Sequence, residues 1–248
     1  MSSPGAIAFT LFGISIRWYG ILIALGILCA IAVSSYRFKK HGLNPDDVPD
    51  IAIICVPAGI IGARLYYVIF EWENYGGDIG KILDIRSGGL AIHGGLIFGI
   101  TAAIFVCKHK KIRLLDGLDA VVCGIVLAQG IGRWGNFFNS EAHGGPTNLP
   151  WAIQVNGIGV HPTFLYESLW CLMLFFLLSH IDKNRKFIGQ TSLLYGILYS
   201  LERFFVEGLR TDSLMIGPFR QAQLLSASVI VICLICYFIL YRKYSNLK

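Results

Sequence analysis

The sequence predicts an all-α, polytopic integral membrane protein with seven transmembrane helices. Of its 248 residues, 55% are hydrophobic and 15% are charged, whereas an ordinary soluble domain has about 25% charged residues. Seven apolar runs approach the roughly 20 residues that a helix needs to cross a bilayer. A helix satisfies its own backbone hydrogen bonds in lipid, and the alternating pattern of barrel strands is absent. This composition excludes a soluble globular protein, a disordered chain and a collagen-like fibre.

The predicted spans follow one another along the chain, at residues 18–36, 51–70, 90–106, 114–131, 164–180, 191–206 and 222–241. The 28 glycines lie mostly inside apolar stretches, as expected where helices pack closely in lipid. No internal repeat or low-complexity segment is detectable. We therefore expect residues 1–248 to form a single membrane-embedded domain, with a larger periplasmic-side segment at about 132–163.

Lysine and arginine predict the orientation of the spans. Thirteen of the 21 basic residues lie in the segments 37–50, 107–113, 181–190 and 242–248, which alternate with the other connections. Such connections are retained in the cytoplasm, so the N-terminus is expected in the periplasm and the C-terminus in the cytoplasm. The net charge of +6 therefore needs no nucleic-acid partner. Of the other eight, Lys81 and Arg220 have the setting of simple loop charges. Six lie near glycine, asparagine, glutamate or histidine: Arg17, Arg64, Arg86, Arg133, Arg203 and Arg210.

The cysteines and histidines do not predict a metal or redox centre. All seven cysteines lie within or at the end of apolar runs, and none belongs to a small, loop-rich disulfide framework. Cys233 and Cys236 form a CxxC pair inside such a run, where inert packing is favoured over redox or metal binding. His93, His143 and His161 are scattered, without the spacing of metal ligands. No metal ion or cofactor is expected.

Residues 129–141 contain the first candidate cluster, at the outer end of the fourth span. Glycines at 130, 132 and 135 allow a ligand or another helix to approach the backbone closely. Arg133 offers a planar fork of donors that suits a phosphate, and Asn136, one helical turn later, is expected to face the same object. The alternative is an interfacial arginine that reaches toward lipid headgroups, with Trp134 in an aromatic belt.

The second cluster lies on one face of the sixth span. Tyr199, Arg203 and Glu207 are spaced by four residues, and Arg210 follows three residues later. Glu202 is expected on a different face. Charged residues inside a span are costly and are by default functional hypotheses, and Arg210 would leave positive charge for an anion. The alternative is a structural Arg203–Glu207 pair that cancels its own charge.

Two further candidates lie at the outer ends of the third and fifth spans. His93 is flanked by glycine pairs and is exposed enough to accept a proton; alternatively, it only donates a hydrogen bond to a neighbour. Glu167 follows a His-Pro-Thr sequence and lies within a span, so it needs a partner, for which Arg64 and Arg133 are candidates. The alternative for this segment is a structural anchor.

Together these residues suggest a site for an anionic lipid near the depth of the outer leaflet. A transporter or flippase of an anionic lipid or solute would use the same charges, but the inverted repeat that would favour it is not visible. An intramembrane protease is a second alternative, although Ser192 and Ser226 lack the setting of its nucleophile.

Several short motifs occur in a fixed order over residues 17–212. They are RWYG at 17–20, GARL at 62–65, HGGL at 93–96, GRWGNFFNSE at 132–141, HPT and LYE within 161–167, and Arg203 to Glu207 followed by Arg210. In this order they resemble bacterial phosphatidylglycerol–prolipoprotein diacylglyceryl transferases, and jointly they are specific. The functional residues that the resemblance supports are Tyr19, His93, Arg133, Asn136, Glu141, Gly144, Tyr199, Arg203 and Glu207.

The resemblance implies that the diacylglyceryl group of phosphatidylglycerol is transferred to the lipobox cysteine thiol of a prolipoprotein. A thioether forms and glycerol 1-phosphate leaves. The expected partners are this lipid, the prolipoprotein signal peptide and the lipid bilayer, in a multi-pass protein of the bacterial cytoplasmic (inner) membrane. A thiol with a free pKa of about 8.5 needs a base or a positive field, and His93 is the candidate base unless it only orients the lipid. We expect Arg133 and Arg203 to hold the phosphate, with Arg210 nearby and Asp119 in support.

Overall fold

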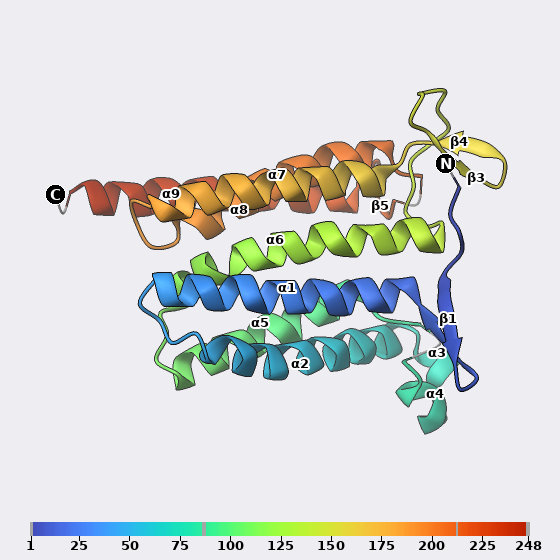
Figure 1. Ribbon diagram of the computed structural model, residues 1–248, viewed down its shortest axis with the longest axis horizontal. Coiled ribbons are helices and arrows are strands. Elements are labelled where there is room, and N and C mark those ends of the chain that lie inside the picture. The colour runs from blue at the N-terminus through green and yellow to red at the C-terminus, as the bar shows by residue number, and fades with distance from the viewer. Residues whose placement is uncertain (1, 86–87, 212, 247–248) are drawn as a thin grey trace. The chain divides into compact units, whose positions relative to one another are not determined.

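The computed structural model describes residues 2–85, 88–211 and 213–246, so Arg86 and Lys248 lie outside the described residues. Its long helices are α1 (Trp18–Lys40), α2 (Asp47–Phe70), α5 (Ile92–His109), α6 (Leu114–Asn139), α7 (Thr163–Lys183), α8 (Gln190–Leu209) and α9 (Gln221–Ser245) (Figure 1). In the described part of the chain, six of them are long and apolar enough to cross a membrane. The protein is therefore a mostly helical, multi-pass membrane protein, as predicted.

Helix α8 is the long helix that differs in composition, because Glu202, Arg203 and Glu207 all lie within it. Its 20 residues still span about 30 Å at 1.5 Å per residue, which matches the thickness of a bilayer core. Seven transmembrane helices and their orientation therefore stay predictions.

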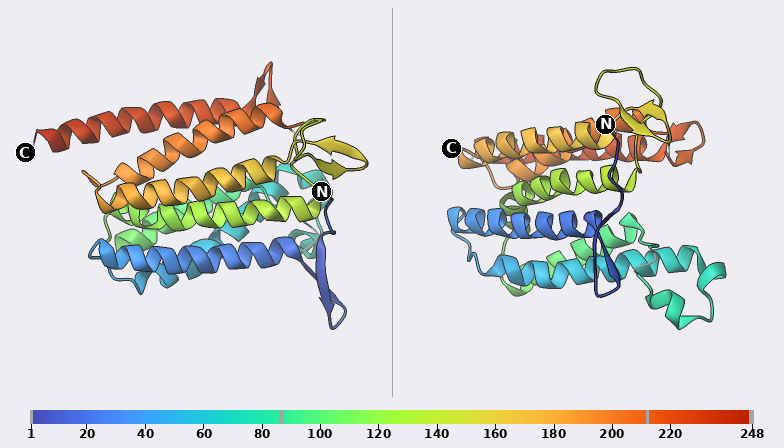
Figure 2. Two further views of the ribbon diagram at one scale, coloured as in Figure 1. Left: turned by 45° about the horizontal axis from the view of Figure 1, so that its top comes forward. Right: turned by 45° about the vertical axis from the view of Figure 1, so that its right-hand side comes forward.

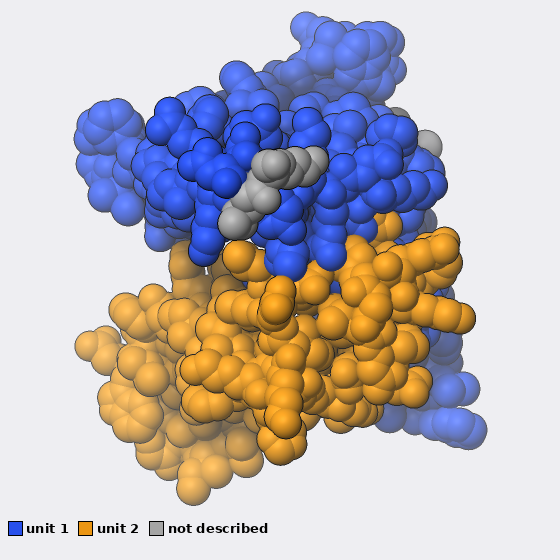
Figure 3. Space-filling model, turned by 90° about the vertical axis from the view of Figure 1, so that its left-hand side faces the viewer, with its two compact units in different colours: residues 1–34, 118–248 blue, residues 35–117 orange. Residues whose placement is uncertain are grey.

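The fourth predicted span ends too early. Helix α6 continues to Asn139, so residues 132–139, assigned above to the outer connection, are helical and keep Arg133 and Asn136 in one rigid element. The chain divides into two compact units, residues 1–34 with 118–248 (unit 1) and residues 35–117 (unit 2), which Figure 3 colours separately. Each unit is described by itself, and a single membrane-embedded domain stays a prediction.

Among the residues that the structure describes, unit 1 contains three two-stranded hairpins that the sequence did not lead us to expect. They are β1 (Ile7–Leu11) with β2 (Ile14–Arg17), β3 (Ile153–Val155) with β4 (Ile158–Val160), and β5 (Met215–Ile216) with β6 (Phe219–Arg220). They lie at the end of unit 1 that is opposite to the C-terminus (Figure 1). The β3–β4 turn is Asn156-Gly157, with φ values of 51° and 81°. This dipeptide favours a two-residue hairpin turn, so the sequence alone was sufficient to predict this hairpin.

In unit 2, α2 and α5 pack through two glycines, and the short helices α3 (Trp72–Tyr75) and α4 (Ile79–Leu83) follow α2. A Cβ added at Gly62 would lie 2.7 Å from the Gly94 carbonyl oxygen, so neither position has room for a larger residue. Beyond the end of α5, the Lys110 ammonium contacts Asp47 and Asp50 at 2.6 Å each. Hydrogen bonds to Asp47 and then to Asp50 raise the pKa of Lys110 above its ordinary value.

Arg64 has a structural role in unit 2. Its guanidinium is buried and donates hydrogen bonds of 2.6–2.9 Å to four backbone carbonyls, those of Lys81, Ile82, Gly88 and Gly89. It therefore organises the chain between α2 and α5. Four of its five N–H groups are used on these carbonyls. Arg64 lies in unit 2 and Glu167 in unit 1, so Arg64 as a candidate partner of Glu167 stays a prediction.

In unit 1, α6 lies beside α1 and α7, and α8 packs against α7 and α9 (Figures 1 and 2). Small residues line these contacts. A Cβ at Gly124 would lie 2.6 Å from the Ala30 carbonyl oxygen, and one at Gly130 would lie 3.1 Å from the Cys171 Cβ. The glycines predicted from composition therefore set how closely the helices approach.

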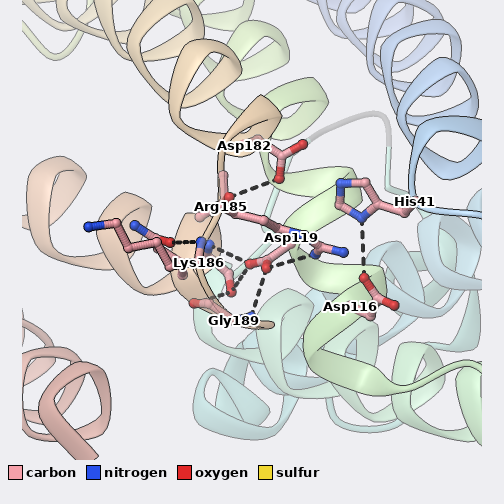
Figure 4. Close-up of polar contacts among 10 residues, drawn as sticks. His41, Asp116, Asp119, Asp182, Arg185, Lys186 and Gly189 are labelled. Carbon is pink, nitrogen blue, oxygen red and sulfur yellow. Dashed lines mark hydrogen bonds and ion pairs between the residues drawn. The ribbon is translucent and has the colours of Figure 1, made fainter. Parts of the chain in front are cut away.

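Asp119 of α6 caps the start of α8 (Figure 4). It is fully buried, and its carboxylate accepts hydrogen bonds from the backbone N–H groups of Gly189 (2.7 Å) and Ser192 (2.8 Å) and from the Ser192 hydroxyl (2.8 Å). The Arg185 guanidinium lies 3.1 Å away. These bonds satisfy N–H groups that a helix start leaves free. Asp119 lies about 21 Å along the helix axis from Arg133, which is too far for the supporting role beside the phosphate that the sequence analysis expected.

Candidate active site

The candidate site is a cluster of charges inside unit 1, contributed by α6, α7 and α8. Arg133 Nη2 lies 3.0 Å from Glu167 Oε1 and donates to the Tyr199 hydroxyl at 3.2 Å. Arg203 Nη1 lies 2.9 Å from the same Glu167 oxygen, and Arg203 Nη2 lies 2.7 Å from Glu207 Oε2. The two sequence clusters at 129–141 and 199–210 therefore form one site.

Burial differs within this cluster. The side chains of Arg133 and Arg203 are each 21% exposed, whereas those of Glu167 and Glu207 are 2% and 4% exposed. The carboxylates thus lie beneath the arginines, which are the more accessible groups. Such an arrangement presents N–H donors toward a ligand while the charges stay paired below.

The alternatives raised for the two arginines are decided by these contacts. Arg203 does pair with Glu207, but it also reaches Glu167 on α7, so the pair is not closed on itself. Arg133 binds Glu167 and Tyr199, and therefore does not simply reach toward headgroups. Trp134 donates to the Ser168 hydroxyl at 3.1 Å, which fixes α6 against α7.

Glycines allow the helices around Arg133 to meet. A Cβ at Gly135 would collide with the ring of Tyr19, which lies in the first turn of α1. A Cβ at Gly132 would lie 3.4 Å from the Ile23 Cδ1. The candidate residue Tyr19 is therefore packed directly against the α6 segment that carries Arg133.

The segment that follows α6 contacts the chain just before α7 and just after α8. Asn136 Nδ2 donates to Glu141 Oε1 at 3.0 Å, so these two candidates meet. The Gly144 N–H donates to the His161 carbonyl at 2.9 Å, and Gly144 pairs with Arg210 in a β-bridge. A Cβ at Gly144 would lie 2.7 Å from the His161 Cβ. Only glycine fits this crossing without displacing a neighbour.

The family follows from sequence comparison. A family model described as "Prolipoprotein diacylglyceryl transferase" matches residues 6–239. The chain belongs to this family. It is 52% identical over 240 residues to the phosphatidylglycerol–prolipoprotein diacylglyceryl transferase of Clostridioides difficile, which covers 97% of both chains. It is 51% identical over 226 residues to that of Finegoldia magna, covering 91% of both, and 46% identical over 239 residues to that of Clostridium novyi, covering 92% of this chain and 93% of the relative. The resemblance predicted from the motifs is confirmed.

His93, a predicted site residue of this diacylglyceryl transferase family member, lies in unit 2. His93 is the second residue of α5 in unit 2, and its ring lies 6.1 Å from that of Tyr66. The arginine cluster lies in unit 1. His93 as the base therefore stays a prediction.

No group of three or more His, Cys, Asp or Glu that could hold a metal ion occurs in the ranges that the structure describes.

Sequence reasoning missed three features of the site. Arg203 is a partner of Glu167 beside the predicted Arg133. Arg220, interpreted above as a simple loop charge, donates to the Glu207 carbonyl. Glu202 is buried, and within the described residues neither of its carboxylate oxygens has a hydrogen-bond partner. The i to i+4 spacing signalled the Arg203–Glu207 pair, but no local signal pointed to the contacts between helices.

Proposed function

We propose that this protein transfers the diacylglyceryl group of phosphatidylglycerol to the thiol of a lipobox cysteine in a prolipoprotein. This proposal rests on one observation: Arg133 and Arg203, from two different helices, contact the same carboxylate oxygen and remain partly exposed. A pair of planar guanidiniums suits a phosphate group. Membership in the prolipoprotein diacylglyceryl transferase family supports the same reaction.

The reaction forms one bond and breaks one. The cysteine sulfur bonds to the glycerol carbon of the diacylglyceryl group, and the bond from that carbon to the phosphate oxygen breaks. The phosphodiester thereby becomes a monoester and leaves as glycerol 1-phosphate with additional negative charge. Arg133 and Arg203 stabilise that charge in a site of low dielectric. Arg210, on the segment that pairs with Gly144, adds positive charge nearby.

The thiol proton requires an acceptor. We assign it to His93, because an imidazole is the side chain most readily poised near neutral pH. Tyr19, Asn136, Glu141, Gly144, Tyr199 and Glu207 then shape the binding site for the lipid and the signal peptide. Asn136 with Glu141 fixes the end of α6, and Tyr199 with Glu207 holds the two arginines.

The proposed setting is the bacterial cytoplasmic (inner) membrane, with seven spans including α8. The N-terminus faces the periplasm and the C-terminus the cytoplasm, which the basic segments support. Reporter fusions after residues 40, 110, 185 and 248 are expected to report a cytoplasmic location. A periplasmic signal from two or more of them contradicts this topology.

The activity is tested by mass spectrometry of a model lipobox peptide, incubated with the protein in phosphatidylglycerol vesicles. The proposal expects a mass gain equal to one diacylglyceryl group, and no gain for a matched peptide with serine in place of the lipobox cysteine. A transporter or flippase would leave the peptide unchanged, and a protease would shorten it. Either result overturns the proposed function.

A further inference from the structure

Glu167 occupies the centre of the arginine cluster. One of its oxygens, Oε1, lies 3.0 Å from Arg133 Nη2 and 2.9 Å from Arg203 Nη1. Its side chain is 2% exposed, and it lies on α7, whereas the arginines come from α6 and α8. A single buried oxygen therefore joins the three helices that build the site.

Both arginines keep donors beyond these contacts. A guanidinium carries five N–H groups. Counting only bonds between described residues, Arg133 uses Nη2, and Arg203 uses Nη1 and Nη2. The Nε of each arginine and the Nη1 of Arg133 are thus available to a ligand. Because Glu167 binds one nitrogen from each side chain, those two nitrogens lie no farther apart than the sum of two hydrogen bonds. The two guanidinium groups are therefore close enough for the oxygens of one phosphate group to accept hydrogen bonds from both.

Electrostatics explains why a carboxylate is needed at this point. Two guanidiniums held close together in a site of low dielectric repel each other. The Glu167 carboxylate between them offsets this repulsion, and Glu207 adds a second negative charge at Arg203. The arginines are therefore already held in place before an anion binds, which is the preorganisation that lowers a reaction barrier.

We propose that Glu167 is a positioning residue for the transfer reaction, which holds Arg133 and Arg203 at the spacing of a single phosphate group. This inference rests on the proposed function, because it takes the ligand of the two arginines to be the phosphate of phosphatidylglycerol. Glu167 acts through the arginines and does not itself touch the reacting atoms.

The sign of one binding measurement separates positioning from simple charge balance. Glu167→Gln keeps the shape of the side chain and removes its negative charge. If Glu167 only balanced charge, the more positive site would bind short-chain phosphatidylglycerol more tightly. Positioning predicts weaker binding by calorimetry in detergent, and a loss of about 10- to 100-fold in kcat/KM, since small misplacements of binding groups are costly. Tighter binding or an unchanged kcat/KM overturns the proposal.

The energetic coupling between Glu167 and Arg133, measured with a double variant, gives a second test. If Glu167 acts through Arg133, the double variant Glu167→Gln/Arg133→Lys should lose little more than the worse single variant, whereas independent effects would multiply. The matched control is Asp182→Asn. It neutralises a buried carboxylate at the other end of α7, which accepts from the Thr191 hydroxyl at 2.9 Å. Its effect on kcat/KM should be small and should multiply with that of Arg133→Lys. Multiplying losses at Glu167 and Arg133 contradict the inference.

A second variant tests the same proposal in case Glu167→Gln folds poorly. Glu167→Asp keeps the charge but shortens the side chain by one methylene, so its carboxylate is not expected to reach both arginines. It should also weaken lipid binding, and wild-type binding by this variant overturns the proposal. A wild-type protein that binds the lipid but leaves the peptide unmodified would refute the proposed function, while the binding comparison would still decide the role of Glu167.

Discussion

Replacing each arginine of the cluster with lysine should separate its role in stability from its role in the reaction. Arg203 uses two different nitrogens, Nη1 for Glu167 and Nη2 for Glu207. Arg133 uses one nitrogen, Nη2, for both Glu167 and Tyr199. A lysine has a single charged nitrogen without the planar fork. Lysine in place of Arg133 can therefore keep both contacts, whereas lysine in place of Arg203 replaces two separate nitrogens by one. We expect it to keep Glu207, on its own helix, and to lose Glu167, which still has Arg133 as a partner.

The expected magnitudes follow from burial. The Glu167 and Glu207 side chains are 2% and 4% exposed, and removing the partner of a buried carboxylate costs about 3–5 kcal/mol. Arg203→Lys should cost less than this, because Glu167 keeps Arg133 as a partner and only one charge-assisted hydrogen bond is lost; we expect it to lower the free energy of unfolding by about 2 kcal/mol. Arg133→Lys should lower it by about 1 kcal/mol or less, the net value of an ordinary hydrogen bond.

The rates should not show this difference. Both substitutions remove a planar donor that stabilises the departing phosphate, which is worth on the order of 3 kcal/mol in the transition state, or about a hundredfold in rate. Alanine at either position should be worse. Unfolding is followed by circular dichroism during a denaturant titration in detergent, and the rate by the mass of the lipobox peptide. Equal losses of stability, or a wild-type rate for Arg133→Lys, would refute the reasoning.

Three further outcomes are expected. A variant with all seven cysteines changed to alanine or serine should retain transfer, because the attacking thiol belongs to the substrate; loss in a folded variant that one restored cysteine rescues would indicate an enzyme-bound intermediate. His93→Gln should lose activity and recover part of it as pH rises toward the substrate thiol's pKa of about 8.5, where solvent ionises the thiol, while the Arg133 and Arg203 variants should not recover; absence of this difference removes His93 as the base. Asp119→Asn should lower the free energy of unfolding by about 3 kcal/mol, because the hydrogen bonds from Gly189, Ser192 and Arg185 lose their charged acceptor, whereas Ser192→Ala should cost about 1 kcal/mol; equal values in a denaturant titration would contradict the capping role.

The sequence by itself determined the class of protein and its family. Lipid requires long apolar helices that satisfy their own backbone, so composition and run length were enough to find the six helices of the described residues that are long and apolar enough to cross a membrane. The family motifs lie in linear order, and the match over residues 6–239 depends on nothing else. Spacing along α8 was also sufficient for the Arg203–Glu207 pair, because residues four apart share a helix face.

The tertiary structure decided which charges meet. Glu167 and its two arginines lie on three different helices, and their contacts depend on the rotation and depth of each helix, which packing through glycines such as Gly130 sets. The same reason applies to Arg64, which binds backbone carbonyls in unit 2, and to Asp119, which caps α8. From the residue type alone we can infer that a buried charge needs a partner. Only the packed helices determine which partner is within hydrogen-bonding distance.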